Sequence, residues 1–260
     1  MDELRHLEVI NDNSGESFST YEAPAVIPKV REELLPFTIS VVSNEERLNK
    51  AVEIRQQAYA RHLPELAEKL REPEAYDHEK GCLVLIAESR MDGSPLGTMR
   101  IQSNEHKPLV LEQSIALPSH FRGKSLAEAT RLGVSQARTG MVVKTALFKA
   151  FYLACIEAEI DWMVIAGRSP MDRQYEGLMF EDVNPGNSWV PLRHAGNIPH
   201  RVMAFDVGAA EQRWRKAGHK LYDFVFRTRH PDIDVRGAGA LLRARGVDVE
   251  QGSRIMGVKA

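Results

Sequence analysis

The sequence predicts an α+β fold, in which a mixed and mostly antiparallel sheet carries helices on both faces. Apolar runs with strand periodicity alternate with segments of helical periodicity along the chain. Between two of these runs, Asp92-Gly93 is typical of the tight turn of an antiparallel hairpin. Further on, residues 126–166 fit a strand, a long helix and a second strand, a crossover unit that sets its two strands parallel in the middle of the sheet.

In the first part of the main domain, the sequence pattern predicts a strand followed by one or two helices. Residues 37–42 (FTISVV) alternate as a strand with one buried face does. Ser43 and Glu46 form a capping box, which predicts the start of a helix that runs toward His62. Pro64 either interrupts that helix or opens a short second one.

A hairpin follows, built from the apolar runs 81–89 and 96–102. Residues 109–117 are apolar but of mixed periodicity, so a strand and a helix both stay open there. The next segment is a basic loop that contains Arg122 and Lys124.

The central unit has the clearest periodicity. Residues 126–134 suit a strand with one buried face, and the run 162–166 suits a strand buried on both sides. A short helix with a tyrosine follows at 175–180. Between the two strands, apolar residues recur at helical spacing: Val143, Leu147, Ala150, Phe151, Ala154 and Ala158.

The last part predicts a hairpin from 188–194 and 201–207, then one helix over 209–228. The patch 238–242 fits a tail or an added helix. The chain therefore divides into an N-terminal arm (1–36) with a short helix near 4–10, a main domain (37–208) and a C-terminal helix and tail (209–260).

The composition is that of an ordinary globular protein. Of 260 residues, 43% are hydrophobic and the formal net charge is −2, so the total charge does not indicate nucleic acid or a membrane surface as a partner. No apolar run is long enough to span a bilayer, and the acidic start differs from a secretory signal. Cys82 and Cys155 lie in apolar elements and predict buried thiols in a reducing cytoplasm. Metal-binding and serine-hydrolase motifs are missing, so no metal is expected.

The turn at 135–141 lies where the first central strand ends and the long helix begins. Free backbone N–H groups and the helix dipole favour an anion at such a position. Gly140 lets the backbone approach a ligand closely, and Arg138 adds a positive charge. Two interpretations stay open, a phosphate site and a tight turn with a solvated arginine.

Six motifs together carry a resemblance to a known family: IRQQAY (54–59), YDHEKGCLVLIAES (76–89), PLGTMRI (95–101), AEATRLGV (127–134), ALFKA (146–150) and YEGLMF (175–180). Their order resembles that of the GNAT acyl-CoA N-acyltransferase fold. Within it, the chain looks like the FeeM-type long-chain N-acyl amino acid synthases and, more distantly, the LuxI-type acyl-homoserine-lactone synthases. Thr130 stands where serine is common in that group, which keeps a hydroxyl. GLMF replaces the usual leucine–glycine–phenylalanine, which puts the geometry of that turn in doubt.

The resemblance implies transfer of a fatty acyl group from a thioester to the amine of an amino acid or similar small acceptor. The donor would be an acyl carrier protein bearing phosphopantetheine, or coenzyme A, used as a co-substrate with no tightly bound cofactor. The two central parallel strands would splay apart to admit the pantetheine arm, and the acyl chain would need an apolar tunnel. A bacterial, cytoplasmic enzyme is implied, with peripheral membrane contact through its lipid product.

Three residues are candidates for the chemistry. Glu128 is the candidate base for the acceptor amine if burial raises its pKa, and a structural ion pair is its alternative. Arg131 either holds the acceptor's carboxylate or orders the cleft. A bulge near Ala129 or Thr130 would let both side chains reach the cleft. Tyr175 is the candidate proton donor for the leaving sulfur, since a phenol pKa of about 10 is near a thiol's of about 8.5, and simple packing is its alternative.

Further residues are candidates for binding the two substrates. Arg55 and Asp77 match polar positions that shape the acceptor side in the synthase group, and a surface salt bridge is their alternative. Arg100 would either hold the acceptor's carboxylate or order the cleft, as Arg131 could, or pair with Glu128 or Asp77. The oxyanion would contact backbone N–H groups near residues 132–134. The full set for the phosphopantetheine donor is Leu132, Gly133, Val134, Arg138, Thr139, Gly140, Met141 and Val142.

Charged and histidine side chains have two interpretations each. His194 and His200 flank a loop and fit surface or core histidines better than metal ligands. Four basic residues would either contact an acidic carrier protein or be solvated: Arg122, Lys124, Arg138 and Lys144.

Three other functions stay open: an acyl-homoserine-lactone synthase that uses S-adenosylmethionine, an ordinary acetyl-CoA N-acetyltransferase, and a non-catalytic thioester-binding regulatory module. The first ranks lower because the aromatic residues of that group are not evident, except Tyr59. The combination of Glu128, Arg131 and Tyr175 argues against the last.

Overall fold

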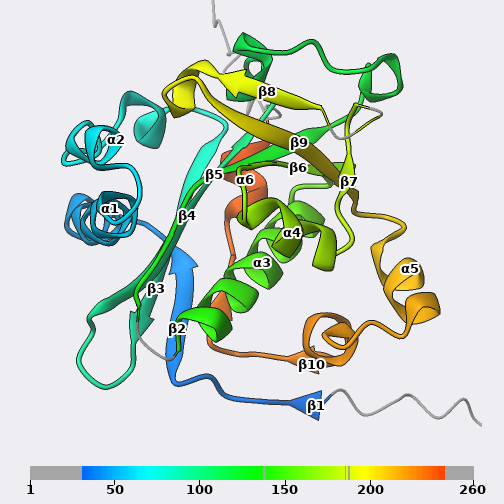
Figure 1. The fold of residues 1–260 in the computed structure, drawn as a ribbon. Coiled ribbons are helices and arrows are strands. Elements are labelled where there is room, and N and C mark those ends of the chain that lie inside the picture. Colours follow the sequence, from blue (N-terminus) through cyan, green and yellow to red (C-terminus); the bar gives the residue numbers. More distant parts are fainter. Residues whose placement is uncertain (1–30, 137–138, 185, 187, 244–260) are drawn as a thin grey trace, which may run out of the picture. The chain divides into compact units, whose positions relative to one another are not determined.

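A computed structural model describes residues 31–136, 139–184, 186 and 188–243. The chain divides into two compact units, Met1–Val30 and Arg31–Ala260. The first unit, with the helix expected near residues 4–10, lies outside the described residues, as does the tail beyond residue 243. The described part of the second unit confirms the predicted α+β class, a mostly antiparallel sheet with helices on both faces (Figure 1). The boundaries expected at residues 36 and 208 stay a prediction.

The described strands of the main sheet number nine, in the order β11-β2-β3-β4-β5-β6-β9-β7, with β8 paired to β9. Two of the pairs, β5–β6 and β11–β2, are parallel, and a separate small sheet joins β1 to β10. The strands are β1 (Arg31–Glu32), β2 (Phe37–Val41), β3 (Cys82–Ser89), β4 (Pro95–Ser103), β5 (Leu126–Val134), β6 (Trp162–Gly167), β7 (Glu181–Asp182), β8 (Trp189–Leu192), β9 (Ile198–Asp206), β10 (Thr228–Arg229) and β11 (Ile233–Asp234).

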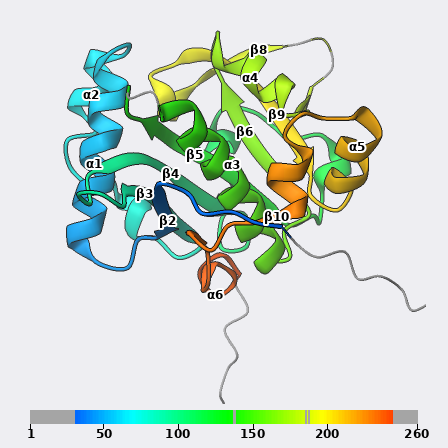
Figure 2. The ribbon, with the colours of Figure 1, turned by 90° about the horizontal axis from the view of Figure 1, so that it is seen from below.

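Helices α1 and α2 lie on one face of the sheet, and α3 crosses the other face with α4 and α6 beside it (Figures 1 and 2). The helices are α1 (Glu45–Ala60), α2 (Pro64–Glu68), α3 (Gly140–Glu157), α4 (Met171–Gly177), α5 (Ala210–Ala217) and α6 (Ala238–Leu242). Shorter helical turns are η1 (Ala75–His78), η2 (Val110–Gln113), η3 (Ser119–Phe121), η4 (Arg193–Ala195) and the π-helical η5 (Asp223–Arg227).

Strand β3 shows how the core is divided. Alternate side chains of a strand point to opposite faces. Leu83 and Leu85 therefore join the large core under α3, whereas Val84 and Ile86 pack against α1. All four are buried, which explains why this strand is apolar without alternation.

Several predicted boundaries differ from the structure. The N-cap of α1 is Asn44, whose side chain accepts a hydrogen bond from the Arg47 amide, so the expected capping box at Ser43 is wrong by one position. Pro64 opens α2, and the ambiguous segment 109–117 contains the short helical turn η2. The predicted helix over 209–228 is also wrong, because Gly218 adopts φ 60° and ends α5 after Ala217.

Two further segments differ in extent. The tyrosine-bearing helix α4 begins at Met171, earlier than the predicted start at Tyr175. After the C-terminal helix, the chain returns to the sheet as β11, which pairs with β2 and was expected to be tail. The apolar patch at 238–242 is the added helix α6.

Among the described residues, none of the helices has both the length and the apolar character of a membrane span.

Candidate active site

The candidate site is the gap between the central parallel strands. Backbone pairing of β5 with β6 runs from Leu126↔Trp162 to Ala129↔Ile165 and stops there. On its other side, β5 stays paired with β4 as far as Val134. The last part of β5 therefore has no partner strand toward β6, and the expected splayed pair is confirmed.

A bulge in β5 lies at the edge of this gap. Thr98 pairs with Gly133 but Arg100 pairs with Thr130, so Arg131 and Leu132 together lie opposite a single residue of β4. Arg131 adopts φ 55°, a conformation that side chains other than glycine rarely take. As a result, the neighbours Thr130 and Arg131 both line the same cavity, which a regular strand would not allow.

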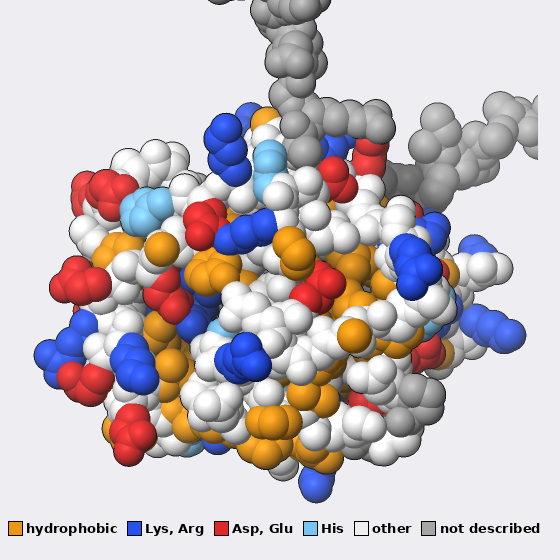
Figure 3. Space-filling model, turned by 90° about the horizontal axis from the view of Figure 1, so that it is seen from above, with side chains coloured by type: hydrophobic (Ala, Val, Ile, Leu, Met, Phe, Trp, Pro, Cys, Tyr) orange, Lys and Arg blue, Asp and Glu red, His pale blue; other side chains and the backbone are white. Residues whose placement is uncertain are grey.

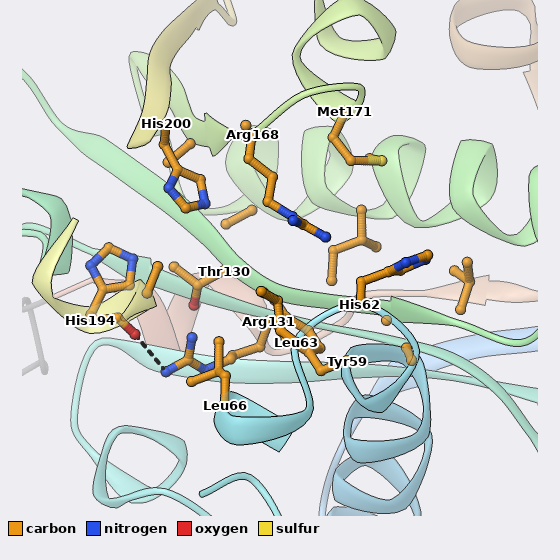
Figure 4. A pocket seen from close by; sticks show the side chains of 18 of the residues that line it. Tyr59, His62, Leu63, Leu66, Thr130, Arg131, Arg168, Met171, His194 and His200 are labelled. Atoms are coloured by element: carbon orange, nitrogen blue, oxygen red, sulfur yellow. Dashed lines mark hydrogen bonds between the residues drawn. The ribbon is translucent and has the colours of Figure 1, made fainter. Parts of the chain in front are cut away.

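Two cavities open from the gap. The polar cavity has a volume of about 300 Å³ and lies between α1–α2, β5, the end of β6 and the β8–β9 hairpin (Figure 4). The apolar cavity has a volume of about 320 Å³ and lies between the sheet, α3 and α4, with Phe148, Phe151 and Phe180 in its wall. The residues that line both cavities are Ala129, Leu132, Lys144 and Tyr175. The two cavities therefore meet where the strands part.

Tyr175 is held at this junction by its packing on β6. A Cβ atom on Gly167 would lie 2.8 Å from the tyrosine ring, so a glycine is needed for the ring to lie so close to the strand. Burial, and then the nearby Tyr59, raise the pKa of Tyr175 and keep its hydroxyl protonated. Beside it, Lys144 donates a hydrogen bond of 2.6 Å to Gln174, and burial lowers the pKa of this lysine.

A buried ion-pair cluster supports the wall of the polar cavity. Arg55 makes a two-pronged contact with Asp77, at 2.8 and 2.9 Å, and Arg131 makes another with Glu74, at 2.6 Å for both bonds. Arg100 joins the two pairs, with 3.0 Å to Glu74 and 3.4 Å to Asp77. Burial alone would raise the pKa of Glu74 and of Asp77, but the guanidinium groups around them hold both pKa values below the usual range.

The cluster contains the three residues predicted for the acceptor side, and their role there stays a prediction. Arg55, Asp77 and Arg100 line neither cavity, and the side chains of the first two are completely buried. They contact each other and Glu74, which also binds Arg131. Of the predicted arginines that the structure describes, only Arg131 reaches the cavity, where its guanidinium also donates to the carbonyl of His194 (Figure 4).

Glu128 lies behind the cavity rather than in it. Its side chain is on the same face of β5 as Thr130, two positions earlier, where η2 covers it and its carboxylate accepts a hydrogen bond from the Leu111 amide at 3.1 Å. It is fully buried, and burial raises its pKa to about 7. The raised pKa fits the predicted base, but the position does not face the cavity, so this role stays a prediction.

The predicted donor residues fall into three groups. Leu132, Gly133 and Val134 line the polar cavity, and Leu132 and Met141 line the apolar one. Thr139, Gly140 and Val142 line neither, and Arg138 lies outside the described residues.

The two glycines of the donor set have roles within the fold. A Cβ on Gly140 would lie 2.6 Å from the Ser135 carbonyl oxygen, so the turn before α3 requires this glycine. Gly133 lies against the backbone of α1, where a Cβ would meet the Arg55 Cα atom at 3.2 Å. The phosphate-binding role of this turn stays a prediction.

The basic residues expected to meet a carrier protein do not form one group. Arg122 and Lys124 are exposed and line neither cavity, whereas Lys144 lies at the junction of the cavities. On the face shown in Figure 3, Lys and Arg side chains alternate with Asp and Glu, so the described residues form no block of one sign there.

The sequence interpretation missed two polar side chains at the end of the polar cavity. His200, read as a surface or core histidine, lines the cavity with His194, and Arg168 extends into it from the end of β6 (Figure 4). Arg168 directly follows the last residue of a central parallel strand, a position where ligands commonly bind. That rule was the signal that would have identified Arg168.

The architecture and the splayed pair define the GNAT class of acyltransferase folds. A structure search finds this fold in FeeM, an N-acyl amino acid synthase from uncultured soil microbes, with a TM-score of 0.56, 16% identity and 72% of this chain and 97% of that chain covered. It also finds BjaI, a CoA-dependent acyl-homoserine lactone synthase solved with SAM and isopentyl-CoA, with a TM-score of 0.52, 16% identity and 75% and 93% covered. No family model and no curated protein sequence matches the chain.

Proposed function

We propose that this protein is an N-acyltransferase that moves a fatty acyl group, long-chain by preference, from a phosphopantetheine thioester to the amine of an amino acid or similar small acceptor. The observation that carries the proposal is the junction of a polar and an apolar cavity at the gap between β5 and β6. An acyl chain needs an apolar space, and a charged acceptor needs a polar one. The thioester carbonyl must lie where the two spaces meet.

The chemistry of the junction fits acyl transfer. The acceptor nitrogen bonds to the thioester carbonyl carbon, and the carbon–sulfur bond breaks. Strand β5 beyond Ala129 has no partner strand toward β6, so its backbone N–H groups near Leu132 are the proposed donors to the oxyanion. Tyr175 at the same junction is the proposed hydrogen-bond donor to the departing sulfur. Its raised pKa keeps the hydroxyl protonated, although it also makes complete proton transfer less favourable.

The acyl chain is proposed to occupy the apolar cavity. Three phenylalanines, Phe148, Phe151 and Phe180, form its wall together with Leu178 and Leu221. Burial of each methylene group in such a space contributes about 0.8 kcal/mol. The proposal therefore favours long-chain over acetyl donors. The pantetheine arm would enter between β5 and β6, with either coenzyme A or an acyl carrier protein behind it.

Product analysis by mass spectrometry tests this function. The purified full-length chain is incubated with acetyl, octanoyl and palmitoyl thioesters of coenzyme A, and separately of an acyl carrier protein, in the presence of all common amino acids. We expect a long-chain N-acyl adduct of one amino acid class. Transfer of acetyl alone would contradict the long-chain assignment, and binding of thioesters without turnover would indicate a regulatory module.

The likeness to an acyl-homoserine-lactone synthase gives a second candidate function. It predicts an N-acyl homoserine lactone and methylthioadenosine when S-adenosylmethionine is the acceptor. The same assay with S-adenosylmethionine in place of the amino acids separates the two candidates, because the lactone and the N-acyl amino acid differ in mass.

A further inference from the structure

Lys and Arg side chains line the polar cavity, and none of the described Asp and Glu residues lines it. Its charged and titratable lining consists of Tyr59, Arg61, His62, Arg131, Lys144, Arg168, Tyr175, His194 and His200. In such a cavity an anionic group is stabilised, whereas an ammonium group is destabilised and gives up its proton more readily, because the low dielectric strengthens both effects. The ligand of this cavity must therefore bring a negative charge.

Most of these cations are already engaged within the described residues. Arg131 is held by Glu74, Lys144 donates to Gln174, and Arg61 donates to the Val134 carbonyl at 2.8 Å. Arg168 differs, since its guanidinium has neither a hydrogen bond nor an ion pair with any described residue, and it points into the cavity (Figure 4). It is half-buried, so it is accessible to a ligand. A guanidinium with all its donors available matches the two oxygens of a carboxylate.

The β6–β9 pairing places His200 near this arginine. The β6–β9 pairing ends at Gly167 and Arg201, so Arg168 and His200 directly follow the last paired residues of their strands, and both side chains lie at the same end of the cavity, close enough for Arg168 to influence His200 (Figure 4). Both line the polar cavity, on the same face of the sheet as Thr130. One ligand can therefore contact both.

The hydrogen bonding of His200 fixes its tautomer. Its Nδ1 lies 2.7 Å from the carbonyl oxygen of Ile198, which only accepts, so Nδ1 carries the hydrogen and Nε2 keeps a lone pair. His200 is 9% exposed. Burial lowers the pKa of His200, the hydrogen bond to Ile198 raises it, and the charge of Arg168 lowers it further. His194 is another titratable group that interacts with His200. At neutral pH the ring is an uncharged acceptor of protons.

We infer that Arg168 and His200 form the acceptor subsite: Arg168 binds the carboxylate of an amino-acid acceptor, and Nε2 of His200 accepts the proton of its ammonium group. This inference rests on the proposed function and narrows it to acceptors that carry both groups. The ammonium gives one proton to Nε2, which passes it to water. The free amine bonds to the thioester carbon, the carbon–sulfur bond breaks, and the second proton of the nitrogen ends on the departing thiolate.

The carboxylate half is tested with Arg168→Met and a pair of acceptors, the amino acid found by product analysis and the amine that lacks its carboxyl group. In the wild-type protein we expect the amino acid to be preferred. In Arg168→Met, the KM for the amino acid should rise by roughly 10- to 100-fold, and the KM for the amine and for the donor should stay unchanged. The matched control is Arg193→Gln, which removes an exposed arginine of η4 outside both cavities.

The proton-accepting half is tested with His200→Gln, which keeps a polar side chain but not the base. We expect kcat to fall by about 10²- to 10⁴-fold near neutral pH, with both KM values kept. The loss should shrink as pH approaches the pKa of the ammonium group, because the free amine then needs no base. A purely structural role for His200 would not give this pH dependence.

The outcomes distinguish failure of the proposed function from failure of the proposed acceptor subsite. If the wild-type protein transfers no acyl group, the proposed function fails and this inference fails with it. If the wild-type protein is active and both variants behave like it, only this inference is overturned. Loss of turnover in Glu128→Gln with normal turnover in His200→Gln would likewise overturn it and assign the base to Glu128. Should either variant lose its fold by circular dichroism, Arg168→Gln and His200→Asn replace it under the same expectations.

Discussion

At the scale of single residues, charge burial decides which side chains the substrates can reach. Arg55, Arg100 and Arg131 are all buried, yet only Arg131 touches the polar cavity. The sequence shows three arginines and an aspartate in suitable elements, but it does not show which partner each guanidinium will find. Glu74 is the residue that organises them, because it contacts all three arginines. Glu74 was not among the candidate residues of the sequence analysis.

The ion-pair cluster predicts that Asp77→Asn strongly lowers the stability of the fold. This change leaves the fully buried guanidinium of Arg55 without its main counter-charge. We expect the free energy of unfolding at pH 7 to fall by about 3–5 kcal/mol, measured by urea denaturation. The pKa of Asp77 is held below its usual value of 3.8, so its stabilisation is present above that pH and is lost only as pH falls further.

The control for Asp77→Asn is Glu68→Gln, which removes one side of the exposed pair with Arg71. An exposed pair contributes about 0–1 kcal/mol, so this variant should unfold close to the wild-type midpoint. Equal effects of the two substitutions would contradict the account of the cluster.

Glu128 should make the protein less stable as pH rises, whereas Asp77 makes it less stable as pH falls. Burial raises its pKa to about 7 from 4.5, so the folded protein holds the proton more tightly than the unfolded chain. Its favourable contribution is complete below about pH 4.5 and is lost as pH rises to about 7. Glu128→Gln should therefore gain stability relative to wild type over this window, by up to roughly 3 kcal/mol. Urea midpoints at several pH values check this, and a difference that does not change with pH would refute it.

At the scale of elements, the position of each helix depends on glycines in the strands beneath it. Gly133 of β5 allows the backbone of α1 to approach, and a Cβ on Gly97 of β4 would meet Val143 of α3 at 2.7 Å. The contact at Gly133 affects the width of the polar cavity, since Ala58 and Tyr59 of α1 form part of its wall. Periodicity predicted the helices and strands, but not how closely they pack.

Gly133→Ala tests this packing. The new Cβ would lie 3.2–3.3 Å from the Arg55 Cα, the Ala58 Cβ and the Ile54 carbonyl oxygen, so α1 must move away. We expect destabilisation by about 1–3 kcal/mol in thermal or urea unfolding. Gly177→Ala is the control, because a Cβ there meets nothing within 4 Å. A stability equal to wild type in Gly133→Ala would show that α1 adjusts without cost.

At the scale of the whole molecule, the sequence predicts the order of elements well and the site less well. The strand–helix–strand unit has strong periodicity over adjacent residues, so 126–166 folds as expected. The site depends on contacts between distant segments, such as the β6–β9 pairing, which ends beside Arg168 and His200. A bulge was predicted near Thr130 because two side chains three residues apart needed the same face. It lies at Arg131 and Leu132, and Glu128 stays covered.

Chain-length selection is a prediction of the two-cavity arrangement. Leu178→Trp adds bulk to the wall of the apolar cavity and should shorten the acyl chain that fits. We expect kcat/KM for palmitoyl thioester to fall at least tenfold relative to octanoyl thioester, since about two excluded methylenes suffice for that ratio. Leu241→Trp on α6, outside both cavities, is the control. An unchanged preference in Leu178→Trp would place the acyl chain elsewhere.

The parallel pairing of β11 with β2 has a consequence for synthesis of the chain on the ribosome. The Leu35 amide donates to the Asp232 carboxylate across a separation of 197 residues, next to that pairing. Translation has thus passed residue 234 before the outer border of the sheet is complete. Until then the backbone N–H and C=O groups on the outer edge of β2 have no partner strand and can pair with other nascent chains. Premature termination upstream of β11 would release a fragment with an unpaired sheet edge, which is prone to aggregate, rather than a shortened form of the folded protein.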